Sequence, residues 1–204
     1  QWDTQLTTDD QGNVTILWSG SPEYFLKQPN GGYSATPGDS STLTLDNGIY
    51  RLVTADNAVV AFLANGQLDY EEDSNGNRIT AGFSNGRLST LTDNVGNQIQ
   101  FTYNAQGRVS LVTGPNGVQA TYSYDDAGTH LLAVTTELGT TQYAYDDGNA
   151  LAQITFRDGS HQYYQYDSQG RLVQESADGG EQVLNYSYGP GLTVTTTDGT
   201  GRWQ

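Results

Sequence analysis

The chain has 204 residues, with 23 acidic side chains, eight basic ones and a formal net charge of −15. A charge of this sign repels phosphate backbones and anionic membrane surfaces, so we predict no nucleic-acid partner. The absence of Cys excludes disulfides, thiolate metal sites and a Cys nucleophile. No run of about 18 apolar residues occurs, so we predict no membrane span.

The composition sends two opposite signals about order. Leu, Ile, Val and Phe make up 40 of the 204 residues, a fraction that with high net charge is typical of disordered chains. However, 14 Tyr and 3 Trp add large side chains that this rule does not count, and the aromatic residues recur regularly. We therefore predict an ordered β protein. Because the chain begins at Gln1 and contains no Met, we expect a processed product or a piece of a longer polypeptide.

Residues 1–60 show β patterns without a strict period. Hairpin turns are predicted at residues 10–13, 29–32 and 46–48. Val14, Ile16 and Trp18 alternate as in a strand, and residues 34–41, rich in Pro, Gly and Ser, are predicted to form a loop. We expect residues 1–60 to be either a β-rich cap that seals a strand edge or a degenerate continuation of the repeats that follow.

Residues 61–204 contain about seven repeats of about 21 residues. One series of turn glycines advances in steps of 20 to 22 residues: Gly66, Gly86, Gly107, Gly128, Gly148, Gly170 and Gly191. A second series lies between them: Gly76, Gly96, Gly117, Gly139, Gly159, Gly179 and Gly199. Each repeat therefore contains two turns, roughly ten residues apart, which is the length of one strand and one turn. We therefore predict tandem antiparallel hairpins.

The turns and strands of the repeat have their own signatures. Residues 104–107 and 167–170 place Asn or Asp first and Gly last, which predicts a type I turn closed by a left-handed glycine. Aromatic pairs two positions apart precede the turns: Phe101 and Tyr103, Tyr122 and Tyr124, Tyr143 and Tyr145, Tyr164 and Tyr166, Tyr186 and Tyr188. Since such pairs share a strand face, we expect the rings to form a column packed in the core. A sugar-binding ladder would require rings that face solvent.

Residues 164–172 read YQYDSQGRL, which resembles the Y-x-Y-D-x-x-G-R-L core of the Rhs/YD-repeat family found in bacterial Rhs proteins, toxin-complex shells and teneurins. Residues 101–109 repeat the pattern, and the resemblance covers about residues 60–197. The repeat-defining residues are Tyr103, Gly107, Tyr122, Tyr124, Asp125, Tyr143, Tyr145, Asp146, Tyr164, Tyr166, Asp167, Gly170 and Arg171.

The resemblance implies an all-β antiparallel sheet of hairpins that spirals into a shell. Bacterial members of the family enclose a toxic C-terminal polypeptide, and teneurins carry the shell in an adhesion ectodomain. We therefore expect a structural segment of a larger exported protein, secreted or at the cell surface, whose partners are the rest of its parent polypeptide and an enclosed C-terminal cargo. Exposed sheet edges should also favour self-association. The alternative is a cell-surface adhesion or carbohydrate-binding module.

The sequence departs from the bacterial shells in two respects. About seven repeats are few for closing a large cavity. None of the five prolines follows an Asp, so we expect no self-cleavage at an Asp-Pro boundary within these residues.

We predict no catalytic residue and no cofactor, and therefore no enzyme. His130 and His161 have no recognisable partner in the sequence, and no G-x-S-x-G nucleophile motif occurs. Carboxylate pairs stand at residues 9–10, 125–126 and 146–147, and the last two follow an aromatic pair. We expect these carboxylates to cap turn amides and not to act as acid and base.

We also predict no metal site. Residues 71–77 resemble the first half of an EF-hand calcium loop, but Glu71 stands at the first ligand position and Gly82 at the last one, where a bidentate Glu is needed. An ordinary turn is therefore expected. Four arginines at or just beyond turns are expected to pair with nearby Asp residues: Arg78, Arg87, Arg108 and Arg171.

Overall fold

The computed structural model describes residues 4–18, 21–190 and 193–202. The predicted turn residue Gly191 and the side chain of Trp18 lie outside the described part. The chain divides into two compact units, Gln1–Gln100 and Phe101–Gln204, which we describe separately. No helix in the described part of the chain has the length and apolar character needed to cross a membrane.

A four-stranded antiparallel sheet opens the first unit. Its strands follow one another in chain order: β1 (Gln5–Thr8), β2 (Val14–Trp18), β3 (Ser21–Lys27) and β4 (Tyr33–Ala35). Leu6, Val14, Ile16 and Phe25 are buried on one face of this sheet. In β2 the buried Val14 and Ile16 alternate with half-buried residues, which is the pattern predicted from the sequence.

The other strands form one antiparallel sheet in which the order in space is the order in the chain. Its first strands are β5 (Thr42–Asp46), β6 (Ile49–Val53), β7 (Val59–Phe62), β8 (Leu68–Glu72), β9 (Arg78–Ser84), β10 (Arg87–Asp93) and β11 (Gln98–Tyr103). They continue as β12 (Val109–Thr113), β13 (Gln119–Tyr124), β14 (Leu131–Thr136), β15 (Gly139–Tyr145), β16 (Leu151–Thr155), β17 (His161–Tyr166), β18 (Leu172–Ala177), β19 (Leu184–Tyr188) and β20 (Val194–Asp198). Two short 3₁₀ segments lie in turns: η1 (Pro115–Gly117) and η2 (Asp178–Gly180).

This topology confirms the predicted all-β sheet of tandem hairpins. The sheet does not close, because β5 and β20 stand at opposite ends of the strand order. The predicted hairpin turns of the first 60 residues are also confirmed, with Gly12, Gly31 and Gly48 at positive φ between consecutive strands.

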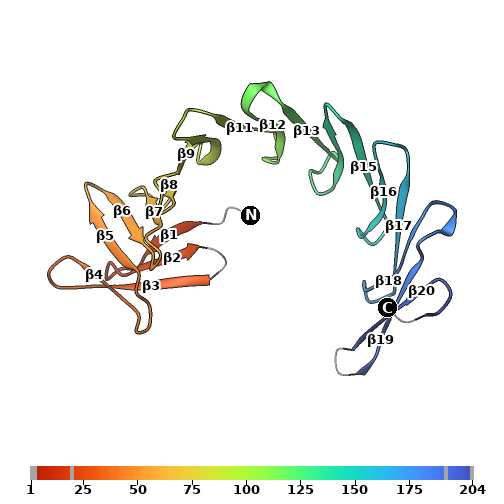
Figure 1. Cartoon of the computed structure of the whole chain (residues 1–204), viewed down its shortest axis with the longest axis horizontal. Helices are drawn as coiled ribbons and strands as arrows, with labels where there is room; N and C mark the ends of the chain where they lie inside the picture. The colour runs from red at the N-terminus through yellow and green to blue at the C-terminus, as the bar shows by residue number, and fades with distance from the viewer. Residues whose placement is uncertain (1–3, 19–20, 191–192, 203–204) are drawn as a thin grey trace. The chain divides into compact units, whose positions relative to one another are not determined.

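The core of the first unit lies around β7, in which all four residues are buried. Figure 1 shows β1 near β8, and Gln5 of β1 forms an isolated β-bridge with Gln67, just before β8. The Leu6 amide of β1 donates a hydrogen bond to the Gly66 carbonyl in the β7–β8 turn at 2.9 Å. Gly66 has a φ of +83°, and a Cβ there would collide with the Leu6 carbonyl. Glycine is therefore required where the small sheet meets the long one.

The region predicted as residues 1–60 contains a change of sheet. The small sheet ends at Ala35, and β5 of the long sheet begins at Thr42. The loop predicted over residues 34–41 is partly wrong, because Ser34 and Ala35 pair with residues of β3. The division of the chain at residue 60 stays a prediction.

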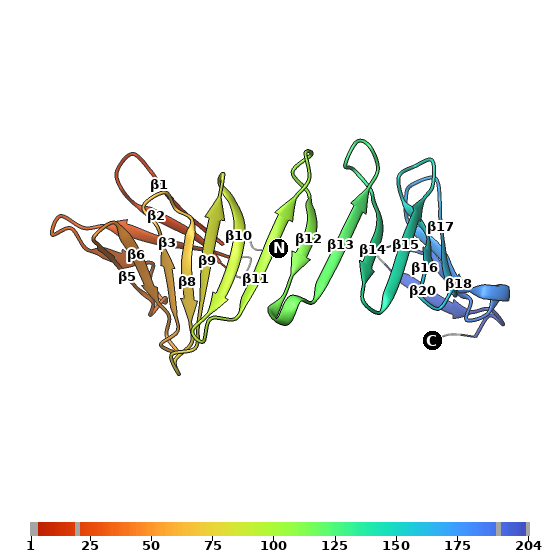
Figure 2. The ribbon, with the colours of Figure 1, turned by 90° about the horizontal axis from the view of Figure 1, so that it is seen from above.

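In the part of the second unit that the structure describes, no second layer covers the sheet. Figure 2 shows its hairpins side by side. Apart from Gly128, none of its described residues is fully buried. In β13, Ala120, Tyr122 and Tyr124 are half-buried, whereas the alternate residues are exposed. The expectation that the tyrosine column packs in a core is therefore only half met, because each ring is covered by neighbouring strands but not from above.

Candidate functional site: the tyrosine-aspartate turns

The turn that begins at Asp167 shows the backbone geometry of the repeat. The Gly170 amide donates to the Asp167 carbonyl at 2.9 Å, and the Asp167 amide donates to the Arg171 carbonyl at 2.9 Å. Gly170 has a φ of +75°. The turn at Asn104 has the same two hydrogen bonds, with Gly107 at +79°. Both are the type I turns closed by a left-handed glycine that the sequence predicts.

The aspartate side chain holds the turn closed. Asp167 Oδ1 accepts hydrogen bonds from the amides of Gln169 at 2.9 Å and Arg171 at 3.0 Å. Asp146 Oδ1 accepts from the amides of Gly148 and Ala150, both at 2.9 Å. The backbone hydrogen bond from Arg171 is the largest cause that lowers the pKa of Asp167 below its ordinary value. These carboxylates therefore cap turn amides, as predicted.

In four of the five aromatic pairs, the second tyrosine reaches back to the preceding repeat. Four hydroxyls donate to strand carbonyls: Tyr124 to Val109 at 2.9 Å, Tyr145 to Leu131 at 3.0 Å, Tyr166 to Leu151 at 2.9 Å and Tyr188 to Leu172 at 2.7 Å. In each case the acceptor is the first residue of a strand. That strand directly follows the previous turn on the same side of the sheet. The tyrosine therefore joins its own turn to the previous turn on that side. Sequence reasoning missed this bond, although the 14 to 16 residues between donor and acceptor are regular.

A β-bulge accompanies three of these four tyrosines. Ser123 pairs with Ala133, but Tyr124 pairs with Leu131, so Leu132 is an extra residue in its strand. The register shifts in the same way at Tyr145 and Tyr166. A bulge bends its strand and increases the local twist. These bulges were not predicted from the sequence.

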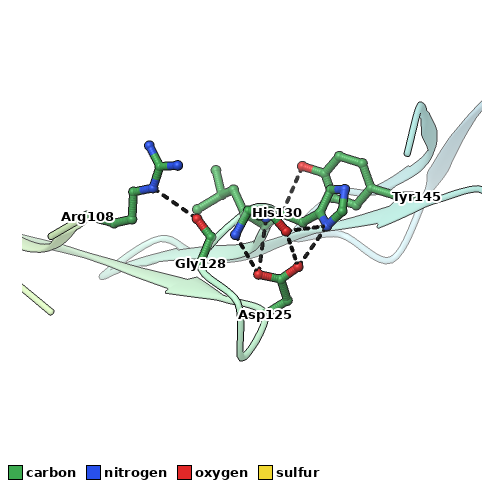
Figure 3. A network of polar contacts seen from close by, with 7 residues as sticks. Arg108, Asp125, Gly128, His130 and Tyr145 are labelled. Carbon is green, nitrogen blue, oxygen red and sulfur yellow. Dashed lines mark hydrogen bonds and ion pairs between the residues drawn. The ribbon is translucent and has the colours of Figure 1, made fainter. Parts of the chain in front are cut away.

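The turn at Asp125 departs from the pattern and brings a histidine to the carboxylate (Figure 3). The Asp125 amide donates to the carbonyl of His130, so this turn is one residue longer than the turn at Asp167. His130 Nδ1 lies 2.7 Å from Asp125 Oδ2, and its ring lies against Tyr145 with 4.4 Å between ring centroids. Hydrogen bonds from Thr129 first and His130 second lower the pKa of Asp125.

His161 also has a carboxylate partner. Its Nδ1 lies 2.9 Å from Asp178 Oδ1, and its amide donates to Asp178 Oδ2 at 2.8 Å. The expectation that neither histidine has a partner is therefore wrong, because both partners are supplied by turns and not by a sequence motif. The Asp125–His130 contacts close one turn, whereas Asp178 joins the β18–β19 turn to the first residue of β17. The described contacts of both pairs thus have a structural role.

Neighbouring turns are joined by long side chains. Arg108 Nε donates to the Gly128 carbonyl at 2.9 Å (Figure 3), and Gln106 Nε2 donates to the Asp126 carbonyl at 3.3 Å. Among the described contacts, the side chain of Arg108 thus has a carbonyl as its partner and not the predicted Asp. Arg171 does pair with Asp167, at 2.7 Å.

Arg78 pairs with a glutamate and not with the predicted aspartate. Its Nη2 lies 2.7 Å from Glu72 Oε2, across the β8–β9 turn. The guanidinium also lies over the ring of Tyr70, 3.8 Å from its centroid.

Two turns of the glycine series are shifted by one or two residues. The left-handed position of the turn at Asp146 is occupied by Asn149, with a φ of +64°, and not by Gly148. After β20 it is occupied by Gly201, at +83°, and not by Gly199. Asn is the residue other than glycine that adopts this conformation most readily, so spacing of glycines alone misplaces the turn.

Asp73, the best candidate in the calcium-like segment, is engaged in its own turn. Its Oδ1 accepts from the amides of Asn75 at 2.8 Å and Asn77 at 2.9 Å, and its Oδ2 accepts from Asn77 Nδ2 at 2.7 Å. Within residues 4–18, 21–190 and 193–202, no group of three His, Cys, Asp or Glu residues is placed to hold a metal ion.

This geometry defines a class of protein, an array of hairpins in which tyrosine hydroxyls join neighbouring repeats and aspartate side chains cap the turns. The model of the teneurin YD-shell family matches residues 67–200, and the chain belongs to this family. Its role is that of a shell segment, a structural scaffold. No curated protein matches the chain.

Solved structures of toxin complexes share the fold. The crystal structure of TcdB2-TccC3-TEV is similar with a TM-score of 0.60 and 15% identity, over 94% of this chain and 12% of that one. The holotoxin pore of the Photorhabdus luminescens Tc toxin, with a mutated TccC3, is similar with a TM-score of 0.57 and 14% identity, over 96% of this chain and 12% of that one. The chain thus spans about an eighth of these proteins, at 12% of their length.

Proposed function

We propose that the chain is a wall segment of a larger, exported YD-repeat protein that encloses or displays a polypeptide cargo. The observation that carries this proposal is the repeated tyrosine bond between turns, which joins hairpins of the second unit into a sheet that has no second layer over its described residues. Such a sheet is stabilised by contacts between neighbouring hairpins, and it needs no ligand or active site. On this proposal the parent polypeptide is secreted or exposed at the cell surface, and the wall itself catalyses no reaction.

The half-buried tyrosine face is the surface that would meet the cargo. Tyr122 and Tyr143 present ring surface, whereas Thr121 and Gln142 on the opposite face are exposed polar residues. An unfolded polypeptide exposes apolar side chains that gain free energy by covering such rings. The tyrosine face would therefore hold an unfolded cargo without a specific site.

Binding of an unfolded test polypeptide would test this proposal. The probe is reduced ribonuclease A whose thiols are carbamidomethylated, so that it stays unfolded. It is basic and is therefore attracted to the acidic chain. We expect it to bind the chain more tightly than native ribonuclease A does. The double variant Tyr122→Ser and Tyr143→Ser should reduce binding, and the matched variant Thr121→Ser and Gln142→Ser should not. Equal loss in both variants, with circular dichroism showing both folded, would contradict the role of the tyrosine face.

Sedimentation velocity with small-angle scattering would test the open wall and its edges. Repeats that do not close on themselves should have a radius of gyration above the ~17 Å expected for a compact domain of this length. Unpaired edges at β5 and β20 should also cause association that grows with concentration. A compact monomer at all concentrations would overturn the wall proposal.

The alternative, an adhesion or carbohydrate-binding module, is favoured by one observation. Phe156, at the start of the β16–β17 turn, leaves 41% of its surface exposed, as stacking on a sugar ring requires. Binding to a glycan array by the chain, lost in the variant Phe156→Ser, would support this second function.

A further inference from the structure

A cleft of about 920 Å³ opens in the second unit over strands β17 to β20. Its floor is formed by residues that lie opposite one another in register: Tyr164 pairs with Glu175, and Glu175 pairs with Leu184. Directly paired residues share a sheet face, so the cleft lies on the face of the tyrosine column. Phe156 adds a ring at its side.

The cleft exists because the β18–β19 turn is irregular. Gly179, Gly180 and Gln182 all have positive φ values, of 68°, 73° and 51°. Strands β18 and β19 share two register pairs, whereas β17 and β18 share five. Gly180 and Gln182 therefore leave the ladder early and line the cleft.

Glu175 breaks the pattern of the repeats. The residue opposite the first tyrosine is Val134 for Tyr122 and Ile154 for Tyr143, but it is Glu175 for Tyr164. A carboxylate in an apolar position loses hydration, so it needs a compensating contact.

Tyr186 supplies that contact and fixes the carboxylate. Its hydroxyl donates to Glu175 Oε1 at 2.6 Å. This bond, together with burial, raises the pKa of Tyr186 to about 12. The bond with Tyr186 holds the Glu175 carboxylate in the cleft and engages its Oε1.

The charges around the cleft are of one sign. Glu175 and Asp198 line it, and none of the lining residues is a lysine or an arginine. Asp198 Oδ1 accepts hydrogen bonds from the amides of Thr200 and Arg202, both at 2.9 Å, so this oxygen is engaged in its own turn. Asp198 adds a second acidic side chain to the lining of the cleft.

We propose that this cleft binds an arginine or lysine side chain carried by a partner polypeptide. The cation pairs with Glu175, and its planar or methylene part packs against the rings of Phe156 and Tyr164. A neutral sugar could stack on the same rings and donate hydroxyl hydrogen bonds to a carboxylate, but it would gain no charge pairing. The inference stands whether or not the parent shell encloses a cargo, because it concerns only residues of the second unit.

Titration of the chain with a short peptide that contains a single arginine tests the proposal. The matched probe is the same peptide with citrulline, which has almost the same shape and no charge. We expect saturable NMR shifts for Tyr164 and Glu175, and affinity about tenfold lower for the citrulline peptide, as for loss of a hydrogen bond to a charged group.

Two variants and one control locate the site. Glu175→Gln keeps an acceptor for Tyr186 and should lower affinity for the arginine peptide about tenfold. Glu175→Val restores the apolar pattern of the earlier repeats and should abolish binding in a folded chain. Glu137→Gln, in the exposed β14–β15 turn, removes the same charge elsewhere and should leave binding unchanged. Equal binding of both peptides, equal effects of the three variants, or tighter binding of maltohexaose than of the arginine peptide would each overturn the proposal.

Discussion

At the scale of single residues, the hydroxyl of the second tyrosine in a pair connects neighbouring repeats. Tyr143 and Tyr145 both place half-buried rings on the same face of β15. Tyr145 also donates its hydroxyl to the Leu131 carbonyl at 3.0 Å, across to the strand that leaves the previous turn. The motif therefore needs tyrosine, and not phenylalanine, in the position just before the aspartate.

Replacement of Tyr145 by Phe tests this role. The ring and its contact with His130 stay, but the Leu131 carbonyl loses its donor. We expect the free energy of unfolding in urea to fall by about 0.5–1.5 kcal/mol. Tyr143→Phe is the matched control, because no hydroxyl bond of Tyr143 is found among the described residues, and it should change stability less. Equal effects of the two variants would show that the hydroxyl bond contributes nothing.

The left-handed turn position is the second decisive residue. Gly170 has a φ of +75° and open space where a Cβ would be, so Gly170→Ala tests backbone conformation without a clash. We expect a loss of about 1–2 kcal/mol in the free energy of unfolding. Gly148→Ala, at an ordinary φ in the equivalent turn, should cost less, because Asn149 occupies the left-handed position there. A larger loss for Gly148→Ala would mean that the turn register is the one expected from glycine spacing.

At the scale of elements, the small sheet carries an unusual carboxylate. Glu23 of β3 pairs with the buried Ile16, and its Oε2 is buried without a hydrogen-bond partner among the described residues. Burial, and then repulsion by Asp39, raises the pKa of Glu23 above its ordinary value of 4.5. The charged form of Glu23 is therefore disfavoured in the folded chain.

This shift predicts a pH-dependent effect of Glu23→Gln. A raised pKa in the folded state means that stability is fully present below the unfolded value and is lost as pH rises through the folded value. The variant should therefore be more stable than the parent at pH 7 and nearly equal to it at pH 3.5. Thermal unfolding at the two pH values would show this difference. A variant that is destabilised equally at both pH values would indicate a packing role for Glu23 instead.

At the scale of the whole molecule, the turns make the fold sensitive to acid. Hydrogen bonds from turn groups lower the pKa of the capping carboxylates below their ordinary value of 3.8: Asp9, Asp73, Asp93, Asp125, Asp158, Asp167 and Asp198. For a lowered pKa the stabilisation is present above the unfolded value and is lost as pH falls through the folded value. We expect stability in urea, at about 0.15 M salt to screen the net charge, to be constant from pH 7 to about 5 and to fall steeply below about 4. Equal midpoints at pH 7 and pH 2.5 would show that the caps do not couple to folding.

Much of this protein could be predicted from its sequence because the relevant physics is local. Alternation of residues sets strand faces, and the order Asp, two variable residues and Gly sets a turn, so the all-β class, the period of about 21 residues and the family resemblance follow without coordinates. The same local rules misplaced the left-handed position of the turn at Asp146, because both glycine and asparagine adopt this conformation. Asn149 occupies the position, and Gly148 does not.

The features that depend on register between strands were decided only by the tertiary structure. The carbonyl that Tyr145 reaches and the place of Glu175 in a cleft follow from which residues lie opposite one another across bulges. A bulge moves that register by one residue, and nothing in the spacing of the repeat records it. Whether the tyrosine face is covered also depends on a second layer, and the second unit supplies none over the residues described. The sequence by itself thus determined the repeat and its family, and the folded chain determined which of its side chains meet.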